Sequence, residues 1–315
     1  MCLAVTVQRE TMPEIIYLNG RLIPRSQATM SPFDHGFLYG YGLFETMRSY
    51  GGHIFRLDRH LDRLRRSLQS LGLPEDIEAP DATAGGHSLE TACIRTLEAN
   101  GLKDARLRLT VTAGEGDMTP DPSTCREPTV LVTARKLVPL PAERYAEGYT
   151  AMLSSIRRNS RSPLSRLKST CYVESILARM DAEDAGCNEA IMLNGEGYLA
   201  EGSTTNIFLV EESLSLEGRG RVRVLITPSV ESGVLPGITR EAVLEIARAI
   251  NIKTAERQVE LQELVDADEA FLTNSILELM PLTRFQGRPV GSGKAGPMTQ
   301  SLLAAYRELV KEETL

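Results

Sequence analysis

Two runs of strand-like and helix-like segments, separated by a proline-containing stretch, constrain the fold of this chain most. In the first run, the leucines of residues 54–73 recur at three- and four-residue spacing among arginines and aspartates. This spacing predicts a helix with one buried face. Ser88 can cap a second helix, and residues 106–112 and 129–133 read as strands. The second run predicts further strands and three more helices, at 170–185, from Gly237 to Ile250, and from Pro297. The mixture predicts an α+β protein.

The stretch between the two runs marks a division into two domains. Pro139 and Pro141 fall in it, and helices and strands rarely continue through such a segment. We predict a smaller N-terminal α/β domain at 1–138, a linker at 139–148 and a larger C-terminal domain at 149–315. Residues 1–14 are expected to be an appendage, and either Met1 or Met12 could be the start. Residues 114–128 are expected to overhang a site, and residues 211–220 to form an exposed hairpin.

Composition narrows the class of protein. The 315 residues carry a net charge of −7 and a pI near 5.4, which disfavours a general nucleic-acid binder. No apolar run approaches the length of a membrane helix, and the first ten residues lack a signal-peptide pattern. We therefore expect a cytoplasmic protein. Its scattered cysteines are expected to be reduced thiols, without a disulfide framework or a zinc site: Cys2, Cys93, Cys125, Cys171 and Cys187.

Two motif types carry little weight. Residues 291–296 match GxGxxG, but only nineteen residues follow them, too few for a dinucleotide-binding unit. They are better interpreted as a loop before the last helix. The four histidines have no ligand-like spacing, so we expect no metal.

Lys168 is the first candidate for chemistry. Only six of the 35 cationic side chains are lysines, and Lys168 alone precedes an amphipathic helix of the core. Desolvation there would lower its pKa, as a Schiff-base lysine requires. From position alone, a lysine whose amine reaches solvent at the helix start is the simpler interpretation.

Two further segments favour a phosphate-bearing cofactor. Residues 201–206 place Glu201 and Asn206 at a tight turn entering a strand. Residues 235–240 open a helix, where the free amides of Ile238 and Thr239 form a natural phosphate site. A lysine, a carboxylate and a phosphate cradle together suit pyridoxal phosphate.

With these motifs the chain resembles the class IV, fold-type IV, pyridoxal-phosphate enzymes. That group includes branched-chain aminotransferases, D-amino-acid aminotransferases and aminodeoxychorismate lyases. The resemblance extends from residue 15 to 309 and includes the segments 55–61 and 201–206. It implies the two-domain, D-amino-acid aminotransferase-like fold, pyridoxal 5'-phosphate as cofactor, and a homodimer with the active site between the domains. The spacer between Phe208 and Thr227 is longer than is usual in the family.

The resemblance also implies residue roles. Lys168 would form the Schiff base and shuttle the proton, Glu201 would pair with the ring nitrogen, and Leu235 would pack on the ring. Tyr172 would lie near the ring hydroxyl, although it follows the lysine by four residues rather than five. The phosphate would be held by Arg56, Ile238, Thr239 and Ser275, with Asn206, Gly237 and Asn274 completing the cofactor site. The alternatives are structural: Arg56 as a helix-start residue, and Asn274 and Ser275 as a strand-end turn.

Within the class, residues 31–48, 155–159, 166–169 and 273–278 most resemble aminodeoxychorismate lyases of the Bacillus type. Thr46 follows lyase usage, and Ala113 stands where D-amino-acid aminotransferases carry an arginine. Arg48 and Arg108 match arginine positions of branched-chain aminotransferases, which leaves transamination open.

The resemblance therefore implies elimination of pyruvate from 4-amino-4-deoxychorismate, giving 4-aminobenzoate for folate synthesis. Lys168 and Thr46 are the predicted catalytic residues. The predicted substrate-binding residues are Tyr39, Thr46, Arg48, Arg106 and Arg108, although Arg106 and Arg108 could instead be strand residues facing solvent. The alternatives are a branched-chain aminotransferase using 2-oxoglutarate and a cofactor-binding protein without activity.

Overall fold

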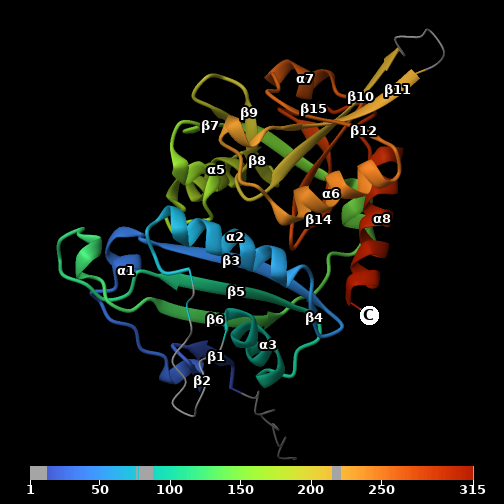
Figure 1. The fold of residues 1–315 in the computed structure, drawn as a ribbon. Coiled ribbons are helices and arrows are strands. Elements are labelled where there is room, and N and C mark those ends of the chain that lie inside the picture. The colour runs from blue at the N-terminus through green and yellow to red at the C-terminus, as the bar shows by residue number, and fades with distance from the viewer. Residues whose placement is uncertain (1–12, 76, 78–87, 215–220, 315) are drawn as a thin grey trace, which may run out of the picture.

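The computed structural model describes residues 13–75, 77, 88–214 and 221–314. Two β-sheets, each with its own helices, form the lower and upper parts of the molecule in Figure 1. The chain passes from the lower to the upper sheet through residues 137–148, which include α4 (Ala142–Glu147). The exact division at 139–148 stays a prediction.

The N-terminal sheet is antiparallel throughout, in the order β2-β1-β6-β5-β3-β4. Its strands are β1 (Ile15–Leu18), β2 (Arg21–Pro24), β3 (Gly42–Tyr50), β4 (His53–Ile54), β5 (Ala105–Thr112) and β6 (Thr129–Lys136). The predicted leucine-rich helix is confirmed as α2 (Leu57–Ser70), which packs with α3 (Leu89–Ala99) on one face of this sheet. The Ser88 cap is also confirmed, because its hydroxyl accepts from the amide of Thr91 at 3.2 Å.

The C-terminal sheet is mixed and has nine strands, in the order β12-β11-β10-β13-β14-β7-β8-β9, with β15 paired to β14. They are β7 (Tyr149–Arg158), β8 (Glu189–Asn194), β9 (Leu199–Gly202), β10 (Asn206–Leu214), β11 (Arg221–Pro228), β12 (Lys253–Arg257), β13 (Glu269–Asn274), β14 (Glu278–Phe285) and β15 (Arg288–Pro289). The accompanying helices are α5 (Val173–Asp184), α6 (Ile238–Ala249), α7 (Leu261–Asp266) and α8 (Pro297–Thr314). β10 and β11 pair antiparallel, as predicted for a hairpin, and residues 215–220 between them lie outside the described residues.

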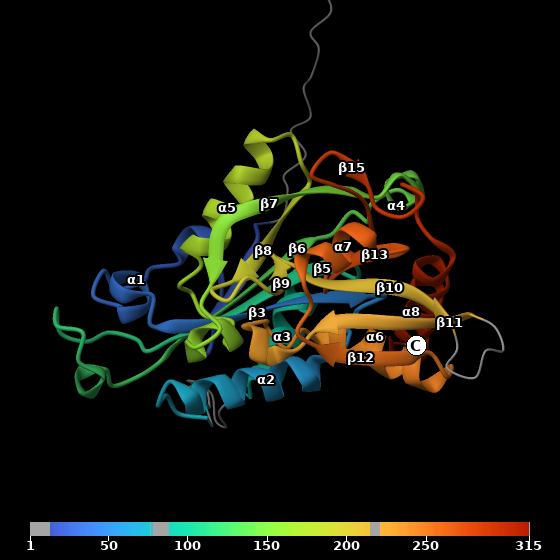
Figure 2. The same cartoon turned by 90° about the horizontal axis from the view of Figure 1, so that it is seen from above.

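The edge of the N-terminal sheet explains how the two parts meet. β4 pairs only with Ser49 and Tyr50 of β3. The rest of β3 therefore has no strand of this sheet on that side. Residues 168–170, which follow β7, hydrogen bond along this edge. α8 runs down beside the lower part in Figure 1, while α2 and α5 lie on opposite sides in the view from above (Figure 2).

Turns and helix ends follow local chemistry. Residues 291–296 form a turn that leads into α8, and Glu269 caps this helix by accepting from the amides of Met298 (3.0 Å) and Thr299 (2.8 Å). A Cβ at Gly296 would lie 2.0 Å from the Glu269 carboxyl carbon, so the close approach requires glycine.

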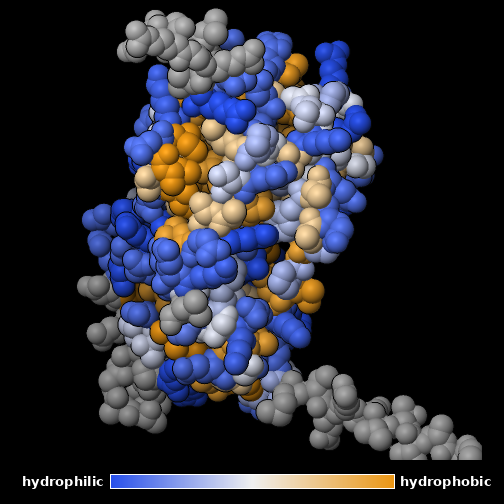
Figure 3. Space-filling model, turned by 90° about the vertical axis from the view of Figure 1, so that its right-hand side faces the viewer, coloured by the Kyte–Doolittle hydropathy of each residue, from blue (hydrophilic) through white to orange (hydrophobic). Residues whose placement is uncertain are grey.

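No helix among the described residues is long and apolar enough to cross a membrane. On the face shown in Figure 3, apolar residues form patches between larger hydrophilic areas.

Candidate active site

A cavity of about 380 Å³ lies between the two sheets. Phe44 and Thr46 of β3 border it, at the part of this strand that β4 leaves free. The predicted site residues that line it are Thr46, Arg106, Arg108, Lys168, Tyr172, Glu201, Asn206, Leu235, Gly237, Ile238, Thr239, Asn274 and Ser275. Segments far apart in the sequence therefore meet in one cavity.

Lys168 is placed by backbone pairing. Its carbonyl accepts from the amide of Phe44 at 2.8 Å, and the amide of Thr170 donates to the carbonyl of Gly42 at 2.9 Å. These bonds extend the β3 edge and leave the lysine side chain in the cavity. The Nζ atom lies 4.7 Å from the centre of the Phe44 ring and 5.8 Å from that of Tyr172.

The surroundings of Lys168 shift its amine toward the neutral form. Burial lowers the lysine pKa most, and the positive charge of Arg63 lowers it further. The charges of Glu45 and Glu201 oppose this effect, and the resulting pKa is about 8. A neutral amine is the form that attacks a carbonyl carbon.

Glu201, on β9, is buried and held in one orientation. Its Oε2 accepts from the amide of Leu235 at 3.0 Å and from Nδ2 of Asn206 at 3.2 Å. Arg158 lies 3.3 Å from its Oε1. Burial raises the pKa of this carboxyl, and the charge of Arg158 is the main effect that opposes the rise. Asn206 thus orients the carboxylate, while Arg158 favours its ionised form.

The start of α6 forms an anion-binding corner of the cavity. Gly237 is the N-cap and offers no side-chain cap, and the first helical bond within α6 is from Glu241 to Gly237. The amides of Ile238 and Thr239 are therefore free to donate to an anion. A Cβ at Gly237 would lie 2.0 Å from Oδ1 of Asn206, so glycine is required for this close packing.

Arg106 and Arg108 enter the cavity from β5. Arg106 is exposed, whereas Arg108 is half-buried with its guanidinium 3.7 Å from the centre of the Phe44 ring. Burial and the neighbouring Arg106 lower the pKa of Arg108. Among the described residues, neither arginine forms an ion pair with an acidic side chain. The cross-strand neighbours of Arg106 differ from it, since Arg48 pairs with Glu278 and Arg135 pairs with Glu14. The cross-strand neighbours of Arg108 are Thr46 and Thr133.

Comparison with known proteins places this geometry in a family. The model of the amino-transferase class IV family matches residues 42–285. The chain belongs to the class IV aminotransferase family. It is 36% identical to the aminodeoxychorismate lyase of Bacillus subtilis over 299 residues, 94% of this chain and 95% of the relative. It is also 36% identical, over 295 residues (93% and 96%), to a Methanocaldococcus jannaschii protein provisionally named a branched-chain-amino-acid aminotransferase.

Solved structures identify the fold and the cofactor. The branched-chain amino acid aminotransferase of Escherichia coli superposes with a TM-score of 0.84 at 29% identity, covering 96% of this chain and 97% of that one. The T.th. branched-chain amino acid aminotransferase, solved with pyridoxamine 5'-phosphate, has a TM-score of 0.84 at 30% identity, with 96% of both chains covered. The predicted α+β fold of class IV enzymes is confirmed. The protein is a pyridoxal-phosphate-dependent class IV enzyme.

The cavity residues fit this cofactor. Thr273 lines the cavity, and its buried hydroxyl has no hydrogen-bond partner among the described residues. This hydroxyl and the free amides of α6 offer donors to a phosphate. Lys168 provides an amine whose lowered pKa makes its neutral form more available, and Glu201 provides a carboxylate for a protonated ring nitrogen.

Arg56 does not reach the cavity, contrary to the prediction. It is the N-cap of α2 with a left-handed φ of 52°, and its guanidinium pairs with Glu245 (2.5 Å) and Glu313 (3.2 Å). Arg63, further along α2, lines the cavity instead. Its Nη1 donates to the carbonyl of Pro236 at 2.8 Å, next to the N-cap of α6.

Arg48 and Tyr39 are also absent from the cavity wall. Arg48 is turned toward β14, where it pairs with Glu278 at 3.1 Å and donates to the carbonyl of Ile276 at 3.0 Å. Arg48 therefore connects the two sheets.

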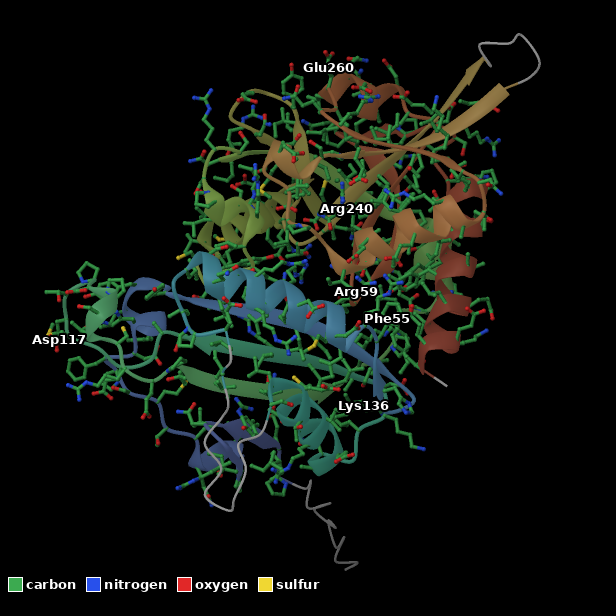
Figure 4. The ribbon with its side chains drawn as sticks, viewed as in Figure 1. Phe55, Arg59, Asp117, Lys136, Arg240 and Glu260 are labelled. Carbon is green, nitrogen blue, oxygen red and sulfur yellow. The ribbon has the colours of Figure 1, made fainter. Side chains whose placement is uncertain are left out.

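Tyr39 ends α1 (His35–Tyr39), and its hydroxyl donates to the carbonyl of Met118. Residues 114–128 pack with α1 and do not overhang this cavity; Asp117 and Lys136 mark opposite ends of the N-terminal sheet in Figure 4.

Other contacts define the remaining predicted residues. Tyr172 is the N-cap of α5 and packs edge-on against Phe44, with ring centres 5.3 Å apart. Asn274 shapes a turn, because its Oδ1 accepts from the amides of Ile276 (2.9 Å) and Leu277 (2.7 Å). Its side chain thus supports the neighbouring Ser275, which lines the cavity.

Proposed function

We propose that this enzyme is an aminodeoxychorismate lyase, which eliminates pyruvate from 4-amino-4-deoxychorismate and yields 4-aminobenzoate for folate synthesis. The observation that carries the proposal is the pair of unneutralised arginines, Arg106 and Arg108, in the cavity wall formed by the described residues. The substrate has two carboxylates, and guanidinium groups pair with carboxylates bidentately. The lyase relative from Bacillus subtilis supports the same assignment.

The bound cofactor supplies an aldehyde carbon that bonds to amines and an electron-withdrawing ring. Glu201 holds the ring nitrogen in its protonated form. Lys168 accepts the proton from C4 of the substrate and carries it to the departing enolpyruvate oxygen. Gain of an aromatic ring favours the elimination. Thr46, on β3, borders the same space and orients the substrate.

The phosphate is assigned to Arg63, to the amides of Ile238 and Thr239, and to the hydroxyls of Thr273 and Ser275. Arg63 replaces Arg56 in this role because only Arg63 lines the cavity. Leu235, beside Glu201, packs on the ring, and Tyr172 lies near the ring hydroxyl.

Purified protein loaded with pyridoxal phosphate tests the assignment. A lyase releases pyruvate and 4-aminobenzoate from aminodeoxychorismate in equal amounts, with no keto acid added. Absence of pyruvate from an enzyme that carries its cofactor would overturn the proposal.

A branched-chain aminotransferase is the second candidate. It is favoured by the Methanocaldococcus jannaschii relative and by the solved branched-chain enzymes. It requires conversion of valine or leucine with 2-oxoglutarate as acceptor. Running both assays on one preparation separates the two activities.

Substitution of Arg108 by glutamine tests the carboxylate contact. We expect KM for aminodeoxychorismate to rise about 10–100-fold, because a charge-assisted pair is lost. Arg135→Gln is the matched control, since Arg135 lies in the next strand but is paired with Glu14 at 3.0 Å. Equal effects of the two substitutions would show that Arg108 acts only through general charge.

We also propose a cytoplasmic homodimer. α5 carries an apolar face that no other described element covers, formed by residues 43–65% exposed: Val173, Ile176, Leu177 and Met180. A face of this kind marks a protein contact. Because α5 begins beside Tyr172, a second copy bound there would lie next to the cavity.

The double substitution Ile176→Glu and Met180→Glu is expected to give monomers. Two carboxylates in an apolar contact cannot be desolvated without a large penalty. Light scattering after size-exclusion chromatography measures the mass. A wild-type monomer, or a variant dimer, would contradict the proposed contact.

A further inference from the structure

A buried cluster of polar side chains lies next to the anion-binding corner of the cavity. Glu45 of β3 and His60 and Arg63 of α2 are 1%, 2% and 5% exposed. Glu45 accepts from Nδ1 of His60 at 2.7 Å, and from Nε and Nη2 of Arg63 at 2.9 and 2.5 Å. The three side chains therefore form one hydrogen-bonded unit between strand and helix.

The protonation states in this unit are defined by its contacts. Burial would raise the pKa of Glu45, but the charge of Arg63 and donation from His60 lower it to about 2. Burial lowers the pKa of His60 more than Glu45 raises it, so the ring is neutral. An ionised carboxylate only accepts, and Nδ1 of His60 must therefore carry the proton.

The cluster holds the Arg63 guanidinium in one orientation and leaves some of its N–H groups without an acceptor. An arginine has five N–H groups. Two are used by Glu45 and a third by the carbonyl of Pro236, at 2.8 Å. Two N–H groups remain, and the guanidinium is fixed beside the N-terminus of α6. A free arginine would lose side-chain entropy on binding an anion, whereas this one is already ordered.

We propose that Glu45 and His60 are positioning residues that hold the Arg63 guanidinium in the geometry required by the phosphate of the cofactor. The inference rests on the proposed placement of that phosphate and is independent of the reaction the enzyme catalyses. Neither residue touches the cofactor, since neither borders the cavity. Glu45 neutralises the buried charge of Arg63 and directs it, and His60 fixes Glu45.

The test compares two ligands, pyridoxal 5'-phosphate and pyridoxal, which differ only in the phosphate. Apoprotein is titrated with each, and binding is followed by absorbance. Because Glu45 also acts on the pKa of Lys168, which bonds to both ligands alike, the affinities are compared as a ratio. For Glu45→Gln we expect the affinity for pyridoxal 5'-phosphate to fall about 10–100-fold relative to the affinity for pyridoxal. Equal losses for both ligands, or no loss for either, would overturn the proposal.

A second series keeps the test decisive if Glu45→Gln does not fold. His60→Ala removes the donor to Glu45, whereas His60→Asn retains an amide N–H at the place of Nδ1. We expect a loss of about fivefold for the phosphorylated ligand in His60→Ala and recovery in His60→Asn. Equal affinities in both variants would refute the role of His60.

Two control variants test the placement of the phosphate separately from the positioning role of Glu45 and His60. Arg59→Gln, on the exposed side of the same helix and labelled in Figure 4, should leave both affinities unchanged. Arg63→Gln should selectively weaken binding of the phosphorylated ligand. If it does not, the phosphate placement itself fails. If Arg63→Gln is selective while Glu45→Gln and His60→Ala are not, only the positioning role fails.

Discussion

Replacing Lys168 with alanine is expected to lower kcat by at least about 10³-fold, because one amine both bonds to the cofactor and moves the proton. Lys168 is the only lysine in the cavity wall formed by the described residues, so no neighbouring amine replaces it. Pyruvate release measures the loss. Borohydride reduction of the wild-type holoenzyme should fix the cofactor to residue 168, detected by peptide mass. A label at another lysine would contradict the assignment.

Arginine at position 168 is the matched control, since it keeps a positive charge but cannot become neutral. It should be as inactive as alanine. The lowered pKa of Lys168 adds a pH signature in the apoprotein. Because only the neutral amine attacks an aldehyde, the rate of cofactor attachment should rise with pH and level off above about 8. A rate still rising at a pH of about 10 would indicate an ordinary solvated lysine.

Local patterns were sufficient to predict much of the fold and part of the site. The leucine spacing of α2 and the capping serine of α3 depend on neighbouring residues alone. Lys168 and Glu201 were predicted because each belongs to a short motif. The prediction that both residues lie in one site came from the family resemblance. The pairing of the lysine segment with the β3 edge joins residues more than about 120 positions apart, so no local pattern contains it.

The arginines show where sequence reasoning failed. Arg56 and Arg63 lie on the same helix, and a motif at the helix start favoured the first. Its partner Glu245 is 189 positions away, so the ion pair that removes Arg56 from the site was invisible. Arg48 was likewise removed by Glu278.

A signal for Arg63 was nevertheless present. His60, Arg63 and Ser67 occupy the buried face of a helix whose other buried residues are leucines. Charged side chains on such a face are rarely left without a partner or a function. This pattern could have identified Arg63 before the structure was known.

The second large effect is expected for Glu201→Gln, with kcat falling on the order of 10²-fold. A neutral amide cannot hold the ring nitrogen in its protonated form, so the ring withdraws fewer electrons during proton removal. The substitution preserves shape, and the contacts to Leu235 and Asn206 can persist. Cofactor affinity should therefore change less than kcat, because Lys168 and the anion-binding corner of the cavity still hold the cofactor.

Glu174→Gln provides the comparison for this change. Glu174 also borders the cavity and lies 3.7 Å from Arg158, but its side chain is 57% exposed. Loss of its charge should leave kcat within about twofold, since solvent screens it. The ratio of the two effects distinguishes contact with the ring nitrogen from a general change of charge around Arg158. Similar losses in both variants would assign the effect to Arg158, and an unchanged kcat in Glu201→Gln would show that the ring nitrogen does not require a carboxylate.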